Sequence, residues 1–192
     1  MSAEPWLKEN GGVLDADKHR RLIMTREAIA HDARIPVELL WSALPEGLSA
    51  EERDWLKHFK QHRSKGYCGL LVTGECSGLD PLSRFGAMAG FLSRHLIRAR
   101  LFSLNEVIES AVSGEPVVAT CLMIPDFIAS TSGKKDTPGW KTQQLSQLLM
   151  DRWSAGGHTQ TVIYAPNVLA IEKEFGSFIA NLVKNHYKTV TA

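Results

Sequence analysis

The stretch YCGLLVTGECSGLDP, residues 67–81, decides the fold class of this chain. It begins with a short apolar run without polar alternation, which is typical of a strand buried on both faces. The run passes into a loop that contains Gly74 and Gly78, and an amphipathic helix is expected after it, over residues 82–97. Strand, glycine loop and helix in this order form the first half of a βαβ unit, which predicts a parallel sheet.

The same alternation of strands and helices continues to the end of the sequence. Apolar strands are expected over residues 100–104, 116–124, 160–165 and 189–191, and helices over residues 105–112, 140–154 and 169–186. This pattern predicts an α/β fold, with a mostly parallel sheet and helices on both faces. Function is then expected in the loops that follow the carboxyl ends of the strands, over residues 74–81, 125–139 and 166–168.

The residues before the first strand are predicted to be helical. A helix is expected over residues 15–33, Pro36 suits the first turn of another, and Ser49 with Glu52 has the spacing of a capping box. We therefore expect two parts, a helical N-terminal extension (residues 1–65) and an α/β domain (residues 66–192). The extension is the expected partner-binding element.

The composition excludes several classes of protein. The 192 residues are 44% hydrophobic and 22% charged, which is typical of a globular chain of one domain plus a small appendage. Twenty-two Lys and Arg against 21 Asp and Glu leave a net charge of +1, so any contact with nucleic acid must be a local patch. Three cysteines without a CxxC pair, and the lack of a signal or membrane-spanning pattern, predict a cytoplasmic protein with reduced thiols and no membrane contact.

The loop after the first strand stands where a phosphate-binding loop would lie. The Walker A motif, G-x-x-x-x-G-K-[ST], needs its second glycine for the turn, its lysine for the phosphate charge and its hydroxyl for Mg²⁺. Here these three positions are Leu79, Asp80 and Pro81. Leucine disfavours a positive φ, aspartate repels phosphate, and proline removes an amide donor at the start of the helix. The loop, with Gly74, Gly78 and Asp80, is therefore interpreted as a vestigial P-loop that holds no cofactor.

Two more strand ends carry single polar residues. Asp126 follows the strand CLMIP at the position of a Walker B acid, and Phe127 stands where a second acid would activate water. Asn167 follows the strand QTVIYAP at the position of a polar sensor residue, although an asparagine there is more often the N-cap of the next helix. We interpret Asp126 as a vestigial metal ligand or a structural cap, and favour the cap for Asn167.

Together these stretches resemble the AAA+ core of the DnaC/IstB-type helicase loaders and transposition ATPases. The resemblance covers residues 67–191 and rests on GLLVTGECSG, ARLFSLNEVIESAV, VATCLMIPDF, LSQLLMDRWSAGGHTQTVIYAPN and AIEKEFGSFIANLV. It includes an arginine-bearing helix, Leu145–Trp153 with Arg152, that leads into the strand ending at Asn167. The resemblance implies a P-loop NTPase-like fold and a bacterial or phage protein of DNA replication or transposition. Its implied partners are a replicative helicase, another AAA+ ATPase or a transposase, with DNA contact and self-association left open.

The family would also carry an arginine finger near the last helix, where this chain has only Lys184. Because the P-loop lysine, the P-loop hydroxyl and this arginine are all missing, we expect a catalytically degenerate, non-enzymatic protein with no catalytic residue and no metal. An alternative is a nucleotide-binding loader ATPase whose unusual site is shared between subunits.

A second alternative is a cysteine hydrolase. The segment Gly74–Gly78 matches the G-x-C-x-G form of a nucleophile elbow, and Cys76, Asp126 and His158 occur in the chain order of an α/β-hydrolase triad. Against this, such an elbow normally follows several strands, whereas here the residues before its strand are mostly helical, and His158 precedes a strand instead of following one.

The remaining candidates are basic. A local nucleic-acid site would use Lys57, Lys60, Arg63, Lys65, Lys134 and Lys135. The first four are interleaved with His58, Phe59 and His62, of which the two histidines have the i, i+4 spacing of metal ligands but no third ligand. A solvated helix face is the plainer interpretation of this run.

Overall fold

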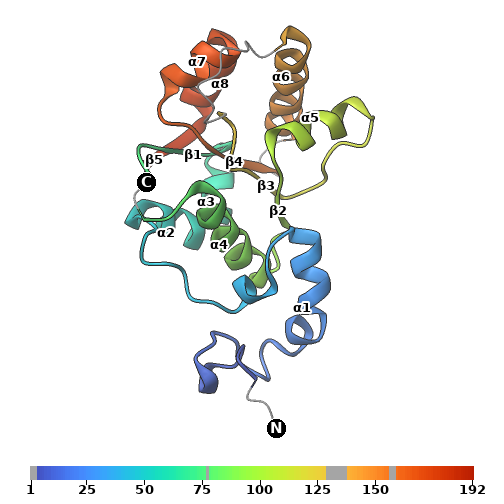
Figure 1. Cartoon of the computed structure of the whole chain (residues 1–192), viewed down its shortest axis with the longest axis vertical. Helices are drawn as coiled ribbons and strands as arrows, with labels where there is room; N and C mark the ends of the chain where they lie inside the picture. The colour runs from blue at the N-terminus through green and yellow to red at the C-terminus, as the bar shows by residue number, and fades with distance from the viewer. Residues whose placement is uncertain (1–3, 77, 129–137, 156–158) are drawn as a thin grey trace.

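The computed structural model describes residues 4–76, 78–128, 138–155 and 159–192. Within them the chain forms a five-stranded sheet in the order β2-β3-β4-β1-β5, and every neighbouring pair is parallel (Figure 1). The strands are β1 (Gly69–Thr73), β2 (Ala99–Leu101), β3 (Cys121–Ile124), β4 (Gln160–Tyr164) and β5 (Tyr187–Thr191). The predicted α/β fold with a parallel sheet is confirmed.

Helices cover both faces of this sheet. On one face lie α1 (Arg20–Ala33), η2 (Val37–Leu40), α2 (Ala50–Lys57), α3 (Phe59–Ser64) and α4 (Pro81–Arg94). On the other lie α5 (Leu104–Val112), α6 (Gly139–Ser154), α7 (Val168–Phe175) and α8 (Ser177–His186). Two buried clusters of apolar side chains, one on each face, result from this layering.

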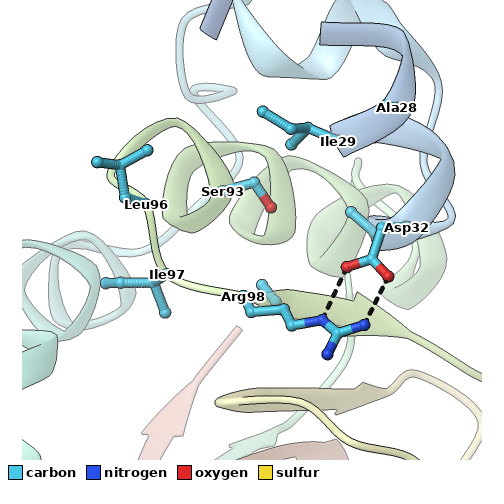
Figure 2. Close-up of a pocket in the computed structure, with 9 residues that line it drawn as sticks. Ala28, Ile29, Asp32, Ser93, Leu96, Ile97 and Arg98 are labelled. Carbon is cyan, nitrogen blue, oxygen red and sulfur yellow. Dashed lines mark hydrogen bonds and ion pairs between the residues drawn. The ribbon is translucent and has the colours of Figure 1, made fainter. Parts of the chain in front are cut away.

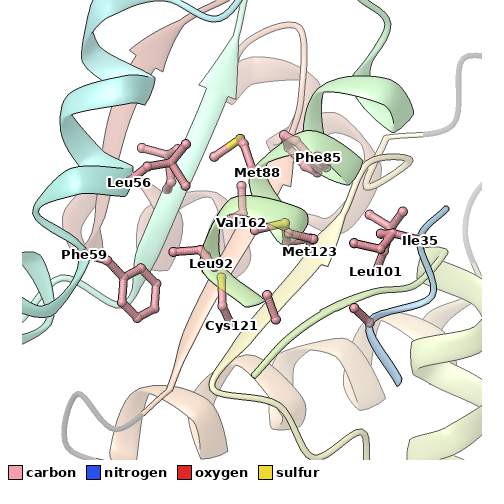
Figure 3. Close-up of a cluster of buried hydrophobic side chains, with 14 of the residues drawn as sticks. Ile35, Leu56, Phe59, Phe85, Met88, Leu92, Leu101, Cys121, Met123 and Val162 are labelled. Carbon is pink, nitrogen blue, oxygen red and sulfur yellow. The ribbon is translucent and has the colours of Figure 1, made fainter. Parts of the chain in front are cut away.

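The N-terminal helices share one of these cores with the sheet. Leu56 and Phe59 pack in the same cluster as Met88 of α4 and Val162 of β4 (Figure 3). Gly90 lets η2 approach α4 closely, because a Cβ at that position would lie 2.3 Å from the carbonyl oxygen of Leu39. The predicted extension is therefore helical, and it covers one face of the sheet with its own apolar residues.

Three predicted elements differ from the structure. The helix expected over residues 169–186 is two helices, because Gly176 has φ 84° and ψ 170° and ends α7. The apolar run 116–124 pairs as a strand only over β3. The helix from Ser49 breaks at His58 into α2 and α3, although the capping box between Ser49 and Glu52 is present as predicted.

The helices that connect the strands change from one face of the sheet to the other after β1. The crossover from β1 to β2 runs through α4 on one face, whereas α5, α6 and the pair α7–α8 return along the other. In such a sheet a ligand usually binds in the crevice between two neighbouring strands whose following helices lie on opposite faces. Here these two strands are β1 and β4. The fold therefore directs attention to the carboxyl ends of these strands.

Candidate functional site

A cleft of about 530 Å³ lies at the carboxyl ends of β2, β3 and β4, beside the start of α4. Its lining combines an apolar floor with one arginine, one tyrosine and three carboxylates. The lining residues are Arg34, Asp80, Pro81, Leu82, Leu101, Phe102, Ser103, Glu106, Pro125, Asp126 and Tyr164. The cleft therefore brings together two of the predicted site residues, Asp80 and Asp126.

Asp80 closes the N-terminus of α4. Its Oδ1 accepts hydrogen bonds from the backbone amides of Leu82 at 3.0 Å and Ser83 at 3.1 Å, and Pro81, which precedes them, has no amide hydrogen to donate. Hydrogen bonds from Ser83 are the main reason why the pKa of Asp80 is lowered. These amides belong to the first turn, where a helix would bind phosphate. The chain's own carboxylate occupies that position.

The glycine loop is also fixed by contacts within the chain. Gly74 has φ 90°, its amide donates to the carbonyl of Pro166 at 3.1 Å, and its carbonyl accepts the hydroxyl of Tyr164 at 2.9 Å. Leu79, at the position of the second motif glycine, packs against Gly47 and the core beneath α4. The backbone groups at the start of this loop thus bond to the strand next to it.

Asp126 and Asn167 also accept backbone amides at the starts of helices. Asp126 Oδ1 accepts from the amide of Leu104 at 2.8 Å, at the start of α5. Asn167 Oδ1 accepts from the amide of Ala170 at 2.8 Å and is the N-cap of α7, as favoured from the sequence. The vestigial metal-ligand and sensor interpretations of these two residues stay predictions.

Arg34 enters the cleft from the N-terminal helices, and the sequence analysis missed it. It follows α1 with φ 60°, its guanidinium lies 4.0 Å from the centre of the Phe102 ring, and its Nη1 donates to Glu106 Oε1 at 2.8 Å. A left-handed backbone at a non-glycine residue has no signal in the sequence, so this placement could not be foreseen. It fastens the end of α1 to α5 across the cleft.

The residues of the hydrolase alternative have other partners here. Cys76 lies beside Tyr164, whose pKa is raised by burial first and then by Cys76 and Glu75. Asp126 is engaged at α5, and His158 lies outside the described residues. Nothing in this geometry singles out Cys76 as a nucleophile.

The structure describes four of the six predicted nucleic-acid residues. Lys57 and Lys60 are exposed in α2 and α3, Lys65 is exposed after α3, and Arg63 belongs to α3. Lys134 and Lys135 lie outside the described residues. The aromatic member of the run is not available for stacking.

That aromatic residue, Phe59, is 2% exposed and packs edge-on against Trp55 with the ring centres 5.2 Å apart. The two histidines of the run also differ in exposure, because His58 is exposed and His62 is buried. Both face Asp54, at 2.9 Å from His58 Nδ1 and 3.8 Å from His62 Nε2. Among the described residues no group of three or more His, Cys, Asp or Glu side chains is placed to hold a metal.

Arg152 lies at the opposite end of the strands from the cleft. Its guanidinium donates to Thr161 Oγ1 at 2.8 Å and to the carbonyls of Gln160 at 2.5 Å and Ala119 at 3.3 Å. Burial lowers the pKa of Arg152. This arginine anchors the end of α6 to the amino ends of β3 and β4.

Comparisons with known proteins give a likeness in structure but none in sequence. Neither a protein-family model nor a curated protein sequence matches the chain. The chain is similar in structure to "Crystal structure of the DnaC helicase loader", with 12% identity, a TM-score of 0.49, and coverage of 73% of this chain and 85% of that chain. At this identity and score the likeness assigns neither a family nor a function. In the described part of the chain, no helix is long and apolar enough to cross a membrane.

Proposed function

We propose that this chain is a catalytically degenerate, loader-like protein that acts by binding a partner protein and does not hydrolyse nucleotide. The proposed partner is a replicative helicase, another AAA+ ATPase or a transposase. Support for the partner comes from the sequence resemblance across residues 67–191, and support for the lost activity comes from the geometry of the cleft.

One observation carries the proposal, the capping of α4 by Asp80. The carboxylate accepts the amides of Leu82 and Ser83, which a phosphate would otherwise bind. A phosphate oxygen about 4 Å from this carboxylate would be repelled by about 1 kcal/mol in water and about 4 kcal/mol at the effective dielectric of a protein surface. Because Asp80 is exposed, the lower figure is the better guide, and the missing P-loop lysine adds to it.

Thermal unfolding with and without Mg-ADP or Mg-ATP tests the proposal. We expect no rise in Tm at millimolar nucleotide, whereas a ligand present at about 100 times its Kd would stabilise the fold by about 2.7 kcal/mol. The matched variant is Asp80→Asn, which keeps a capping oxygen and removes the charge. A rise in Tm of the unmodified chain would overturn the proposal.

The alternative with a site shared between subunits makes a different prediction. It requires self-association, so nucleotide should raise Tm at high protein concentration and not at low concentration. A Tm that is insensitive to nucleotide at both concentrations argues against it.

The partner half of the proposal needs its own measurement. The chain is added to the purified replicative helicase of the source cell, and the ATPase rate of the helicase is followed. We expect the rate to change at a stoichiometric ratio and the chain alone to hydrolyse nothing. Hydrolysis by the chain alone would contradict the proposed loss of activity.

A further inference from the structure

The C-terminal end of α4 lies between two hollows that share Ile97. One, of about 460 Å³, is bordered by α2 and α3 and by Phe91 and His95. The other, of about 330 Å³, lies between α1 and the turn after α4 (Figure 2). We call the two together the α4 groove. Neither hollow belongs to the cleft at the carboxyl ends of the strands.

The first hollow is cationic. Lys57, His58, Lys60 and His95 lie on its lining, all four are exposed, and none of its lining residues is acidic. Asp54, one turn before His58, is engaged by that histidine at 2.9 Å and by the Nζ atom of Lys188 at 3.4 Å. Its negative charge is therefore already compensated, and the rim presents uncompensated lysines.

The second hollow is apolar and electrically neutral. Ile29 of α1, Leu96 and Ile97 contribute its apolar surface (Figure 2). Asp32 and Arg98, which also line it, form two hydrogen bonds of 2.8 and 2.9 Å with each other. The groove thus runs from a basic hollow to an apolar one along the end of a single helix.

Leu96 is held out into solvent by an unfavourable backbone. Its side chain is 83% exposed, and its φ of 60° lies in the left-handed region, which costs a non-glycine residue roughly 1–2 kcal/mol. Glycine or asparagine would suit the position better for folding alone. The amide of Leu96 donates to the carbonyl of Ser93 and that of Ile97 to the carbonyl of Leu92, so this residue ends α4, and its exposed side chain adds apolar area beside the second hollow.

The aromatic rings of the groove do not favour nucleic acid as that surface. His95 lies against Phe91 with the ring centres 4.3 Å apart, and the guanidinium of Arg94 lies 5.2 Å from the same ring. Phe59, a third ring of the hollow, is buried in the core, and the ring of His58 is held by Asp54 at 2.9 Å. Binding of single strands relies on free rings for base stacking. A protein segment with acidic and apolar residues matches the groove better.

We propose that the α4 groove binds an acidic amphipathic helix of the partner protein. Carboxylates of that helix would pair with Lys57 and Lys60, and its apolar face would cover Leu96 and Ile97. This inference rests on the proposed partner-binding function and names the surface that performs it. The surface is composite, because α1, α2 and α3 of the N-terminal helices and α4 of the α/β domain all contribute.

The experiment uses the full chain and two synthetic peptides. One is a fluorescein-labelled peptide of about 18 residues with leucines at i, i+3, i+4 and i+7 and glutamates on its other face. The second has the same composition with the leucines spread around the helix. Fluorescence anisotropy gives the Kd of each, and a labelled oligothymidine of similar length is measured beside them. We expect the first peptide to bind at least fivefold more tightly than the second peptide and than the oligothymidine.

Charge reversal on two faces of the molecule provides the matched control. Lys57→Glu with Lys60→Glu should weaken binding of the first peptide at least tenfold. Lys173→Glu with Lys184→Glu changes the net charge equally on exposed positions of α7 and α8, and should change the Kd less than twofold. Leu96→Gly should weaken binding about fivefold without loss of folding, because glycine suits a positive φ.

The outcomes separate this inference from the proposed function. Equal effects of the two charge reversals, a preference for the second peptide, or no binding at all would overturn the groove assignment. Tighter binding of oligothymidine would instead assign the groove to nucleic acid. None of these results depends on nucleotide, so the thermal test at the cleft stands or fails separately.

Discussion

The two ends of α4 are closed in different ways. At the first end, Asp80 caps the helix and Pro81 starts it, so the donors that a ligand would use are bonded within the chain. At the last end, Leu96 stands exposed in a left-handed backbone between two hollows. Both ends of α4 are therefore closed by hydrogen bonds, but only the last end holds a non-glycine residue in a left-handed backbone.

This difference teaches where binding capacity is kept. Native proteins depart from the locally best residue mainly at functional sites. In a nucleotide-binding protein the departure would be expected at the glycine loop, yet here that loop is capped and tied to β4 through Gly74 and Tyr164. Non-glycine residues in a left-handed backbone lie instead at Arg34, which enters the cleft from the end of α1, and at Leu96, on the surface that we assign to a partner.

The largest expected effect comes from the ion pair that fixes the capped end. Arg84 of α4 donates to Glu52 of α2, and the two side chains are 1% and 0% exposed. Arg84→Met leaves the Glu52 carboxylate buried without its cation, which should lower the free energy of unfolding by about 3–5 kcal/mol. Urea denaturation measures the change.

An exposed pair on the other side of α4 provides the control for this variant. Arg98→Met breaks the bonds to Asp32, and because both side chains are partly exposed we expect a loss below about 1 kcal/mol. Adding Glu52→Gln to Arg84→Met should recover roughly half of the lost stability. If Arg84→Met and Arg98→Met lower the free energy of unfolding equally, the ion pair at the first end of α4 is not the main polar contact that holds this helix in place.

Asp80→Ala removes the cap directly and should destabilise the chain by about 1 kcal/mol, with no gain of nucleotide binding. Because the pKa of Asp80 is lowered on folding, its contribution is present above about pH 4 and is lost as the pH falls through the folded value. Asn167→Ala removes the comparable cap of α7 and should cost a similar amount. Guanidinium denaturation at about pH 7 compares them, and a gain of Mg-ADP binding in Asp80→Ala alone would mean that the carboxylate was the sole barrier.

Much of the fold could be predicted from the sequence because its signals are local. Unalternating apolar runs predicted the strands, and Ser49 with Glu52 predicted the start of α2. The single helix expected over residues 169–186 failed at Gly176, since a glycine within an apolar pattern does not reveal whether its φ is positive.

The site was predictable only where it follows a strand. Asp80, Asp126 and Asn167 were placed by their positions after apolar runs, and all three accept backbone amides at the starts of helices. Arg34 and the α4 groove depend on how distant segments pack, and no local pattern reports that. Phe59 shows the opposite failure, because its place in a basic run suggested exposure and tertiary packing buried it.

The opposite end of α4 should respond to substitution with the opposite sign. Leu96→Gly relieves the strained backbone but makes the unfolded chain more flexible, so we expect a net gain in stability of about 0.5 kcal/mol. Leu96→Ala keeps the strain and removes the exposed side chain, and should change stability little. Thermal unfolding of both variants beside Asp80→Ala tests the contrast. A clear loss of stability in Leu96→Gly would mean that the leucine serves folding and not binding.

The smallest expected effect concerns His62, which lies behind the basic hollow and beside exposed His58. Burial lowers the pKa of His62, nearby Lys188 lowers it further, and Asp54 opposes them. Because the folded pKa lies below the unfolded value of about 6.5, the unfolded chain takes up the proton first as the pH falls. The free energy of unfolding should therefore decrease as the pH falls through about 6.5 toward the lower folded pKa. His62→Phe should flatten this slope. If the slope is the same with and without His62, other groups produce the pH dependence of the free energy of unfolding. The buried side of α3 would then be no more sensitive to protons than the exposed side that borders the groove.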